Sequence, residues 1–165
     1  MKRLGLLSDT HGWIDKKYAE YFGVCDEIWH AGDIGSTETA DYLAGIKPFR
    51  AVYGNIDDYT IRQMYPKTAH FKVEDVTVMM THIGGYPGRY DPSVRLELYR
   101  TKPTLFVAGH SHILKVMFDK NLQCLHINPG AAGISGMQTV RTLIRFTIDK
   151  SEIKDLEVIE LGGGL

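Results

Sequence analysis

The sequence predicts an α/β protein built from two mixed β-sheets that pack as a sandwich, with helices on the outer faces. Two observations predict this fold class. The first half of the chain interleaves short apolar runs with helical segments, and the part after residue 102 consists mostly of short apolar runs joined by turns. Because the chain has no internal repeat, low-complexity tract or linker, we expect a single domain over residues 1–165.

The first half reads as a βαβαβ unit. Three apolar runs of strand length alternate with two helical segments, at residues 3–7, 16–22, 27–30, 37–44 and 49–53. Ser36 fits the N-cap of the second helix and Gly45 its C-terminal stop. Strands that alternate with helices in this way are parallel, so we expect three parallel strands here.

The second half adds paired strands, one more helix and an antiparallel meander. A helix begins after Asp91, with Pro92 at its first position. The expected strands span residues 71–74, 76–80, 105–108, 114–118, 122–127, 139–148 and 153–161. The last four of these strands, joined by short turns, are predicted to form the antiparallel meander. The tail at 162–165 is expected to be loose.

The composition is that of an ordinary globular protein. A hydrophobic fraction of 44% and a charged fraction of 24% show no sign of disorder or of a disulfide scaffold. The net charge of -1 gives no general attraction to nucleic acid or to an anionic membrane, so a nucleic-acid partner is disfavoured. Cys25 and Cys124 lack metal-ligand spacing and are expected to be reduced core thiols.

The N-terminus does not read as an export signal. Asp9 and His11 end the first apolar run too early for a signal peptide, and no apolar stretch approaches the roughly 18 residues that cross a bilayer. We therefore expect a cytoplasmic protein without a membrane partner, and leave open whether it forms a homo-oligomer.

Side chains that can bind metal follow five of the apolar runs. They are Asp9, His11, Asp33, Asn55, His82, His110 and His112. Any one of them alone is an ordinary turn residue, but four of the chain's 7 histidines belong to this set. Because the C-terminal ends of parallel strands meet at one edge of a sheet, we expect these side chains to face one crevice. Alternate residues of an extended segment point the same way, which suits the Asp-x-His and His-x-His spacings.

This set of donors predicts a site for two divalent metal ions. Nitrogen and oxygen ligands without thiolate favour Mn²⁺, with Ni, Fe, Zn or Co as alternatives. Seven groups are too many for one tetrahedral ion. If one carboxylate bridges, they suffice for two ions about 3.5 to 4 Å apart.

The same residues, in the same order, resemble a known family. The motifs SDTHG, HAGD, GN-x-D, TH and GHSH look like the calcineurin-like metallophosphoesterase superfamily. The chain length and INPG at residues 127–130 resemble its small single-domain phosphodiesterase branch, which also includes the homologous retromer subunit. The resemblance covers nearly the whole chain, and it implies a four-layer αββα arrangement that agrees with the strand pattern.

The resemblance implies a role for each residue of the set. Asp33 corresponds to the bridging carboxylate. The first ion would be held by Asp9, His11 and His112, and the second by Asn55, His82 and His110. The implied reaction is attack of a bridging hydroxide on a phosphodiester, either small or nucleotide-like.

Four other residues qualify this picture. Asp57 matches a position that holds the Asn55 loop, and His30 is expected to steady the site from behind, although each also fits a purely structural role. Arg89, in a glycine-rich loop, is expected to reach substrate oxygens. Ile56 stands where larger relatives carry a histidine thought to protonate the leaving group, so we expect no general acid there and a preference for stable leaving groups.

Two other functions stay open at this point. A non-enzymatic metal-binding scaffold of the same fold would keep the ligands and bind protein partners. A nuclease is disfavoured, because the chain has no basic excess. Since GISG at 133–136 misses the G-x-S-x-G spacing and no P-loop follows a strand, serine hydrolases and nucleotide-cofactor enzymes fit poorly.

Overall fold

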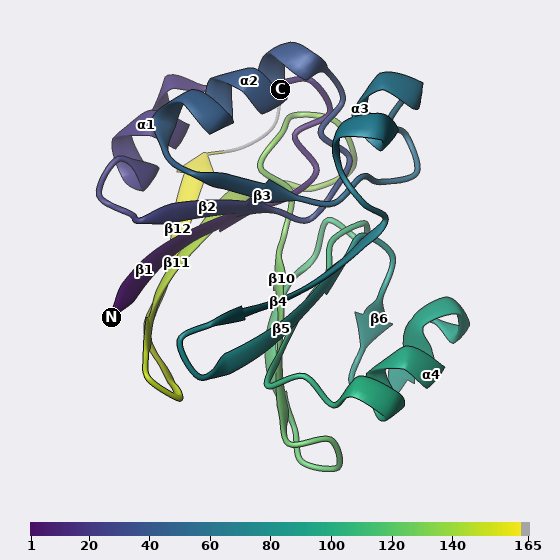
Figure 1. The fold of residues 1–165 in the computed structure, drawn as a ribbon. Helices are drawn as coiled ribbons and strands as arrows, with labels where there is room; N and C mark the ends of the chain where they lie inside the picture. Colours follow the sequence, from purple (N-terminus) through teal and green to yellow (C-terminus); the bar gives the residue numbers. More distant parts are fainter. Residues whose placement is uncertain (163–165) are drawn as a thin grey trace.

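The computed structural model describes residues 1–162. These residues form two five-stranded sheets, a two-stranded ribbon and four helices (Figure 1). The two sheets are mixed and carry helices on their outer sides, which confirms the predicted fold class. The single domain expected over residues 1–165 stays a prediction, and the tail at 163–165 lies outside the described residues.

The first sheet contains the predicted βαβαβ unit. Its strand order is β12-β11-β1-β2-β3, with β1, β2 and β3 parallel and with β11 antiparallel to both its neighbours. Its elements are β1 (Lys2–Leu7), α1 (Lys16–Phe22), β2 (Glu27–His30), α2 (Thr37–Ile46), β3 (Phe49–Ala51), β11 (Arg141–Asp149) and β12 (Glu152–Gly162).

The second sheet has the order β4-β5-β8-β10-β9. Its three central strands are parallel, and the two edge strands run antiparallel to their neighbours. The strands are β4 (Thr68–Val73), β5 (Val76–Thr81), β8 (Leu105–Val107), β9 (Leu114–Asp119) and β10 (Cys124–Pro129). The remaining elements are α3 (Tyr59–Met64), β6 (Gly85–Tyr86), β7 (Arg89–Tyr90) and α4 (Pro92–Thr101).

The main core lies between the two sheets. Successive side chains of a strand point to opposite faces, so alternate apolar residues of each inner strand face this layer. From the first sheet, Leu4 and Leu6 enter it, and from the second sheet, Val78 and Met80 do so. All four side chains are almost fully buried. This pattern is why the sheets pack as a sandwich.

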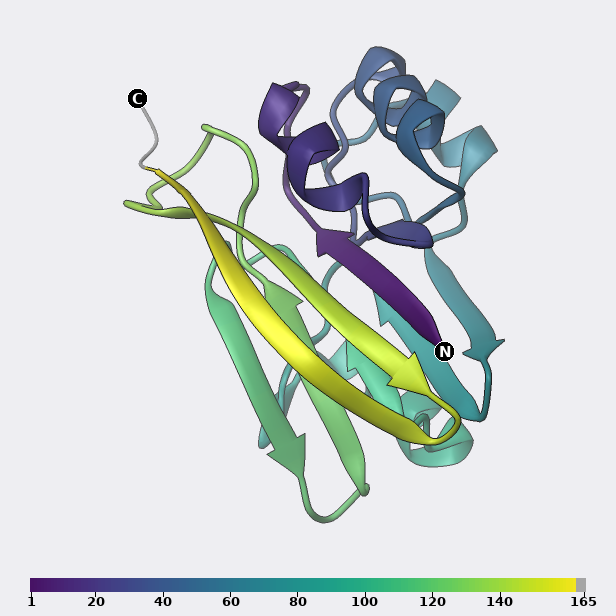
Figure 2. The same ribbon diagram turned by 90° about the vertical axis from the view of Figure 1, so that its left-hand side faces the viewer.

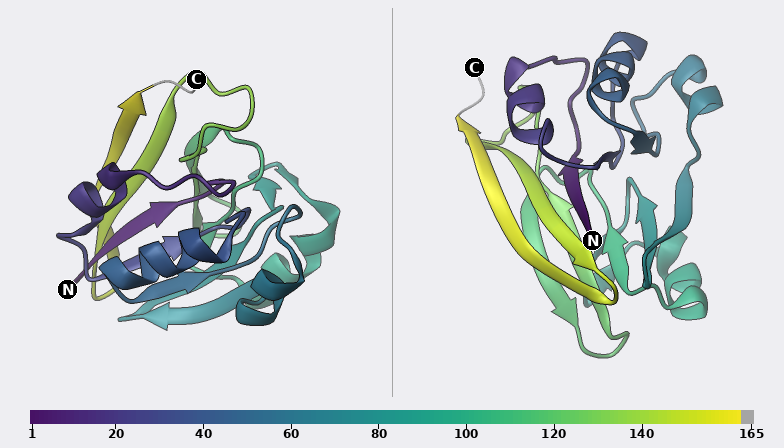
Figure 3. Two further views of the ribbon diagram at one scale, coloured as in Figure 1. Left: turned by 90° about the horizontal axis from the view of Figure 1, so that it is seen from above. Right: turned by 60° about the vertical axis from the view of Figure 1, so that its left-hand side comes forward.

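Helices cover the outer face of each sheet, on the side away from the main core. Leu7 and Ile28 pack against Tyr18 and Phe22 of α1, and Figure 3 shows α1 and α2 on the same side of the first sheet. On the second sheet, Phe106 contacts a cluster that includes Leu98 of α4. Cys25 and Cys124 are buried free thiols within these helix-facing layers, as predicted.

The predicted end of α2 was wrong. The helix continues through Gly45 to Ile46, and Lys47 is its extended C-cap. A Cβ at Gly45 would meet open space, so this glycine serves no special turn. The helix ends instead because Pro48 follows: a residue that precedes proline is disfavoured in the helical conformation.

The predicted meander was also only partly right. Segments β9–β10 and β11–β12 are antiparallel hairpins, but they belong to different sheets, as Figure 2 shows. Helix α3 and the β6–β7 ribbon were not predicted, because each is too short for a clear apolar period. None of the helices among residues 1–162 is long and apolar enough to cross a membrane.

Candidate metal centre

The predicted ligands lie just beyond the ends of five strands. Three of these strands, β1, β2 and β3, belong to the first sheet, while β5 and β8 belong to the second. The expectation of a single sheet edge was therefore wrong. Side chains reach the crevice from two packed sheets, so they can surround it more completely than one edge would allow.

Six predicted ligands form two clusters of three. Asp9, His11 and His112 each offer one donor atom, all within 4.8 Å of one another, and the same holds for Asp33, His82 and His110. Oδ2 of Asp33 lies 3.1 Å from Nε2 of His82 and 3.3 Å from Nε2 of His11. This carboxylate thus lies between the clusters, where the resemblance implies a bridge.

The seventh predicted ligand, Asn55, lies beside the second cluster. Its Oδ1 is 3.0 Å from Nδ1 of His110. The structure therefore brings all seven predicted residues into one site, and the short contacts that connect them run from both sheets.

Asp9 turns one carboxylate oxygen toward the site. Its Oδ2 accepts hydrogen bonds from the Ser8 hydroxyl at 2.6 Å and from the His110 backbone N–H at 3.1 Å. Its Oδ1 then faces Nε2 of His112 at 3.2 Å and Nε2 of His11 at 3.7 Å. The two hydrogen bonds hold the carboxylate so that Oδ1 remains available to a cation.

Two of the histidines are held by hydrogen bonds at their far nitrogens. Nδ1 of His82 donates to the backbone oxygen of Ala31 at 2.8 Å, and Nδ1 of His112 donates to Oε1 of Gln138 at 2.9 Å. Because an oxygen acceptor fixes the hydrogen on Nδ1, Nε2 of each ring keeps its lone pair. Gln138 was not predicted, since nothing local marks a glutamine in a glycine-rich loop.

The unpaired atoms of the site fit a bound cation. Among residues 1–162, four buried side-chain atoms have no hydrogen-bond partner, and three of them are Oδ1 of Asp9, Nε2 of His11 and Nε2 of His82. Buried polar atoms are nearly always paired. Divalent ions of the kind that imidazole and carboxylate bind, one at each cluster, would satisfy all three.

The backbone at the site adopts unusual conformations. Five predicted ligands have φ between 47° and 74°, namely Asp9, His11, Asp33, His110 and His112. Positive φ is uncommon outside glycine, and such residues gather at functional sites, where the surrounding structure holds them. These values indicate that the loops are arranged for the side chains they present.

Two motif glycines leave room for the carboxylates. A Cβ at Gly54 would collide with the Asp33 carboxylate, and a Cβ at Gly109 would collide with the Ser8 hydroxyl. Both glycines directly precede a predicted ligand, Asn55 or His110. Close packing of the loops therefore requires glycine at these two positions.

The cluster is strongly polarised. Burial raises the pKa of the Asp33 carboxyl, but its close contacts with the imidazoles of His11 and His82, which attract the carboxylate when they are protonated, outweigh this effect and hold the pKa well below its usual range. The neighbouring carboxylates of Asp33 and Asp9 stabilise the protonated ring and raise the pKa of His11 to about 9. Protons and metal ions thus compete for the same atoms, as in metal sites generally.

Asp57 and His30 lie behind the predicted ligands. The buried Asp57 carboxylate accepts hydrogen bonds from three backbone N–H groups, those of Ile34, Gly35 and Gly54. These bonds connect the Asp33 and Asn55 loops, which supports the role proposed for this residue.

His30 is fully buried. Its Nδ1 accepts from the Gly32 N–H at 3.0 Å, so Nε2 donates to Oγ1 of Thr10, which in turn donates to the Ile34 carbonyl. This chain of hydrogen bonds joins the ends of β1 and β2, from which Asp9 and Asp33 project.

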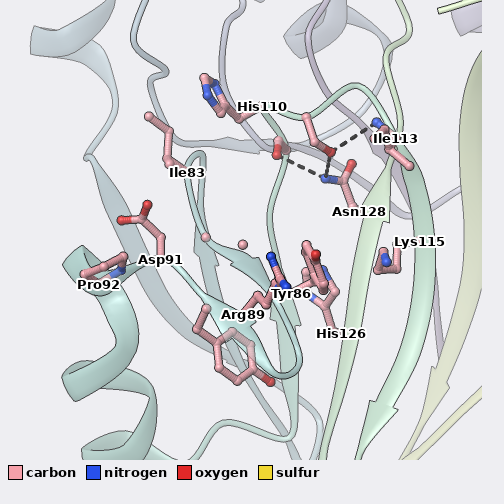
Figure 4. Close-up of a pocket in the computed structure, with 15 residues that line it drawn as sticks. Ile83, Tyr86, Arg89, Asp91, Pro92, His110, Ile113, Lys115, His126 and Asn128 are labelled. Atoms are coloured by element: carbon pink, nitrogen blue, oxygen red, sulfur yellow. Dashed lines mark hydrogen bonds between the residues drawn. The ribbon is translucent and has the colours of Figure 1, made fainter.

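The two remaining candidates are Arg89 and Ile56. Arg89 belongs to the β6–β7 ribbon and lines a cavity of about 350 Å³ that also contains His110 (Figure 4). The side chain of Ile56 is 46% exposed, and its backbone N–H donates to Oδ1 of Asp33 at 3.1 Å.

The fold and the site together define a metal-binding α/β protein of the metallophosphoesterase type. The model of the calcineurin-like phosphoesterase superfamily domain matches residues 1–151. The chain therefore belongs to this superfamily, as the sequence motifs predicted. A probable metallophosphoesterase of Methanothermobacter thermautotrophicus is 26% identical to this chain, over 96% of this chain and 92% of the relative's length.

Solved structures show the same fold. Vps29 of Entamoeba histolytica, complexed with Zn²⁺, matches with a TM-score of 0.76 at 16% identity, over 97% of this chain and 98% of that chain. A structure described as a novel archaeal phosphodiesterase matches with a TM-score of 0.74 at 18% identity, over 96% of this chain and 99% of that chain. Both structures match along nearly the whole length of this chain, consistent with the small branch of the superfamily.

Proposed function

We propose that this protein is a phosphodiesterase that uses two divalent metal ions, with Mn²⁺ favoured, to hydrolyse a small or nucleotide-like phosphate diester. Membership of the superfamily supports metal-dependent phosphoester hydrolysis. The observation that carries the two-metal proposal is the position of Asp33, whose Oδ2 lies within 3.3 Å of histidine nitrogens from both clusters.

The residues of the chain would have separate tasks. Asp9, His11 and His112 would hold one ion, Asn55, His82 and His110 the other, and Asp33 both. When bound, such ions activate a water molecule and stabilise charge on phosphoryl oxygens. The carboxylates and the glycine-rich turns set the positions of these groups before substrate arrives, and Arg89 would bind a substrate oxygen.

Two cavities beside the site support a diester in preference to a monoester. The cavity that contains Arg89 and His110 adjoins a second one, also of about 350 Å³, which contains Asn55 and His82. The two share Ile83 and Asp91 in their linings. A phosphate held at the second cluster could therefore place one ester arm in each cavity.

A comparison of hydrolysis rates between the wild type, a site variant and a control variant tests this proposal. The Mn²⁺-loaded protein would be compared on bis(4-nitrophenyl) phosphate, on 4-nitrophenyl phosphate and on single-stranded DNA. We expect diester hydrolysis that falls by at least about a hundredfold in Asp33→Asn. The matched control is Asp41→Asn, an exposed position in α2, which should keep the wild-type rate. Equal rates in wild type and Asp33→Asn would refute the enzyme proposal.

A second candidate is a metal-binding scaffold that binds a protein partner. Strand β9 forms one edge of its sheet and exposes several apolar side chains there, those of Leu114, Val116, Met117 and Phe118. Exposed apolar clusters of this kind often mark interaction surfaces. Metal binding without any turnover of the three substrates would favour this function over hydrolysis.

A further inference from the structure

The cavity that contains His110 has a buried floor and two flanking loops. The loops are residues 83–92, which include the β6–β7 ribbon, and residues 109–113, while β9 and β10 contribute Lys115, His126 and Asn128 (Figure 4). Its volume of about 350 Å³ is typical of small-molecule sites. A ligand in this cavity would lie next to the second ligand cluster.

His126 lines this cavity and has an unused acceptor. Its side chain is 1% exposed, and its Nδ1 donates to the Phe106 carbonyl at 3.1 Å. A carbonyl only accepts, so the hydrogen is on Nδ1 and Nε2 carries a lone pair. Burial lowers the pKa of His126 to about 4, which keeps the ring neutral at pH 7. Within residues 1–162, its Nε2 is the one unpaired buried side-chain atom outside the metal-ligand clusters.

The other buried polar side chains of the cavity are already paired. Nδ2 of Asn128 donates to the Gly109 carbonyl and to Oγ of Ser111, and Oδ1 of Asn128 accepts from the Gly130 N–H. The Tyr90 hydroxyl donates to Asp119. Nε2 of His126 is therefore the group that a hydrogen-bond donor on a ligand would complete.

The walls suit a ring with both polar and apolar edges. Nζ of Lys115 lies 4.1 Å from the centroid of the Tyr86 ring, and Arg89 lies in the same wall. Ile83 and Ile113 supply apolar surface. The cavity is thus lined by two cationic side chains, Lys115 and Arg89, and by His126, whose Nε2 is an acceptor without a partner.

We propose that this cavity is the subsite for one organic arm of the diester, and that Nε2 of His126 selects an arm bearing an N–H or O–H donor, as nucleoside arms do. The inference rests on the proposed phosphodiesterase function, because only a diester has two organic arms, but it concerns binding and not turnover. His126 would accordingly determine specificity, since it touches the arm and not the reacting phosphate.

Binding calorimetry with the Mn²⁺-loaded protein tests this inference. The ligands are thymidine 5′-monophosphate and two analogues that each lack one donor, the N3-methyl base and the 3′-deoxy sugar. We expect the wild type to bind one analogue about tenfold more weakly than the parent, which corresponds to one lost hydrogen bond. We expect His126→Leu to bind parent and analogue equally, because it lacks the acceptor.

Two further variants separate recognition from folding. His126→Gln restores an acceptor and should recover part of the discrimination, whereas His70→Leu, on β4 and outside this cavity, should keep the wild-type ratio. The inference would be overturned if the wild type bound all three ligands equally. It would also be overturned if His126→Leu still bound the analogue more weakly than the parent. Hydrolysis of thymidine 5′-(4-nitrophenyl) phosphate, measured separately, reports on the proposed function, so the two failures are distinguishable.

Discussion

Oε1 of Gln138 lies 2.9 Å from Nδ1 of His112, and this hydrogen bond leaves Nε2 of His112 facing Asp9. The glutamine itself is held, because its Nε2 donates to the backbone oxygens of Gly133 and Ser135. A predicted ligand of the first cluster is therefore oriented by a loop that contributes no ligand.

Replacing Gln138 by leucine should weaken metal binding. Loss of the hydrogen bond frees the His112 ring to rotate, and such outer partners typically contribute 10- to 100-fold in affinity, so we expect a loss of about tenfold or more. Competition with a chromogenic chelator would measure it. Gln63→Leu, at an exposed position of α3, is the matched control and should bind as wild type does. Unchanged affinity in Gln138→Leu would show that His112 needs no such support.

Two neighbouring aspartates should differ sharply in their effect on stability. Asp57→Ala leaves three backbone N–H groups without their acceptor, and we expect it to lower the free energy of unfolding by about 3 kcal/mol or more. Asp58→Ala removes only the N-cap of α3, at a cost of about 1 kcal/mol. Urea denaturation of both variants provides the comparison, and equal losses would contradict the role assigned to Asp57.

A histidine at position 56 should accelerate hydrolysis of poor substrates. The backbone N–H of Ile56 already contacts Asp33, and a general acid contributes about 10²- to 10⁴-fold when the leaving group is poor. We expect Ile56→His to raise the hydrolysis of an alkyl phosphate monoester at least about tenfold, with Ile56→Leu at the wild-type rate. If neither variant changes that rate, the side chain at position 56 does not face the substrate.

Buried neutral histidines should make the protein sensitive to acid. Burial lowers the pKa of His126 to about 4 and that of His30 to about 3. The unfolded chain takes up these protons below about pH 6.5 and the native state does not, so stability is lost as the pH falls from about 6.5 toward about 4. The free energy of unfolding should therefore fall with decreasing pH in this range. We expect His126→Gln to reduce the slope of this free energy against pH by up to about 1.4 kcal/mol per pH unit, as measured by denaturation across that range. An identical slope would mean that His126 is protonated in the native state.

Local chemistry is what makes much of this protein predictable from its sequence. The alternation of apolar residues in β1 and β5, the cap residues Ser36 and Asp91, and the donors that follow five of the strands all depend on neighbours within a few positions. For that reason the βαβαβ unit and the seven candidate ligands could be stated before any coordinates, whereas the two-sheet layering depended partly on the resemblance to the metallophosphoesterase superfamily.

Only the tertiary structure decided how these pieces meet. The division of the ligand-bearing strands between two sheets, the separation of the β9–β10 and β11–β12 hairpins, and the contact of Gln138 with His112 each depend on packing between residues far apart in the sequence. The same is true of His126, whose unpaired Nε2 exists because the Phe106 carbonyl occupies its other nitrogen. A pattern read along the chain records which groups are available, whereas their partners are set by the packing of the two sheets.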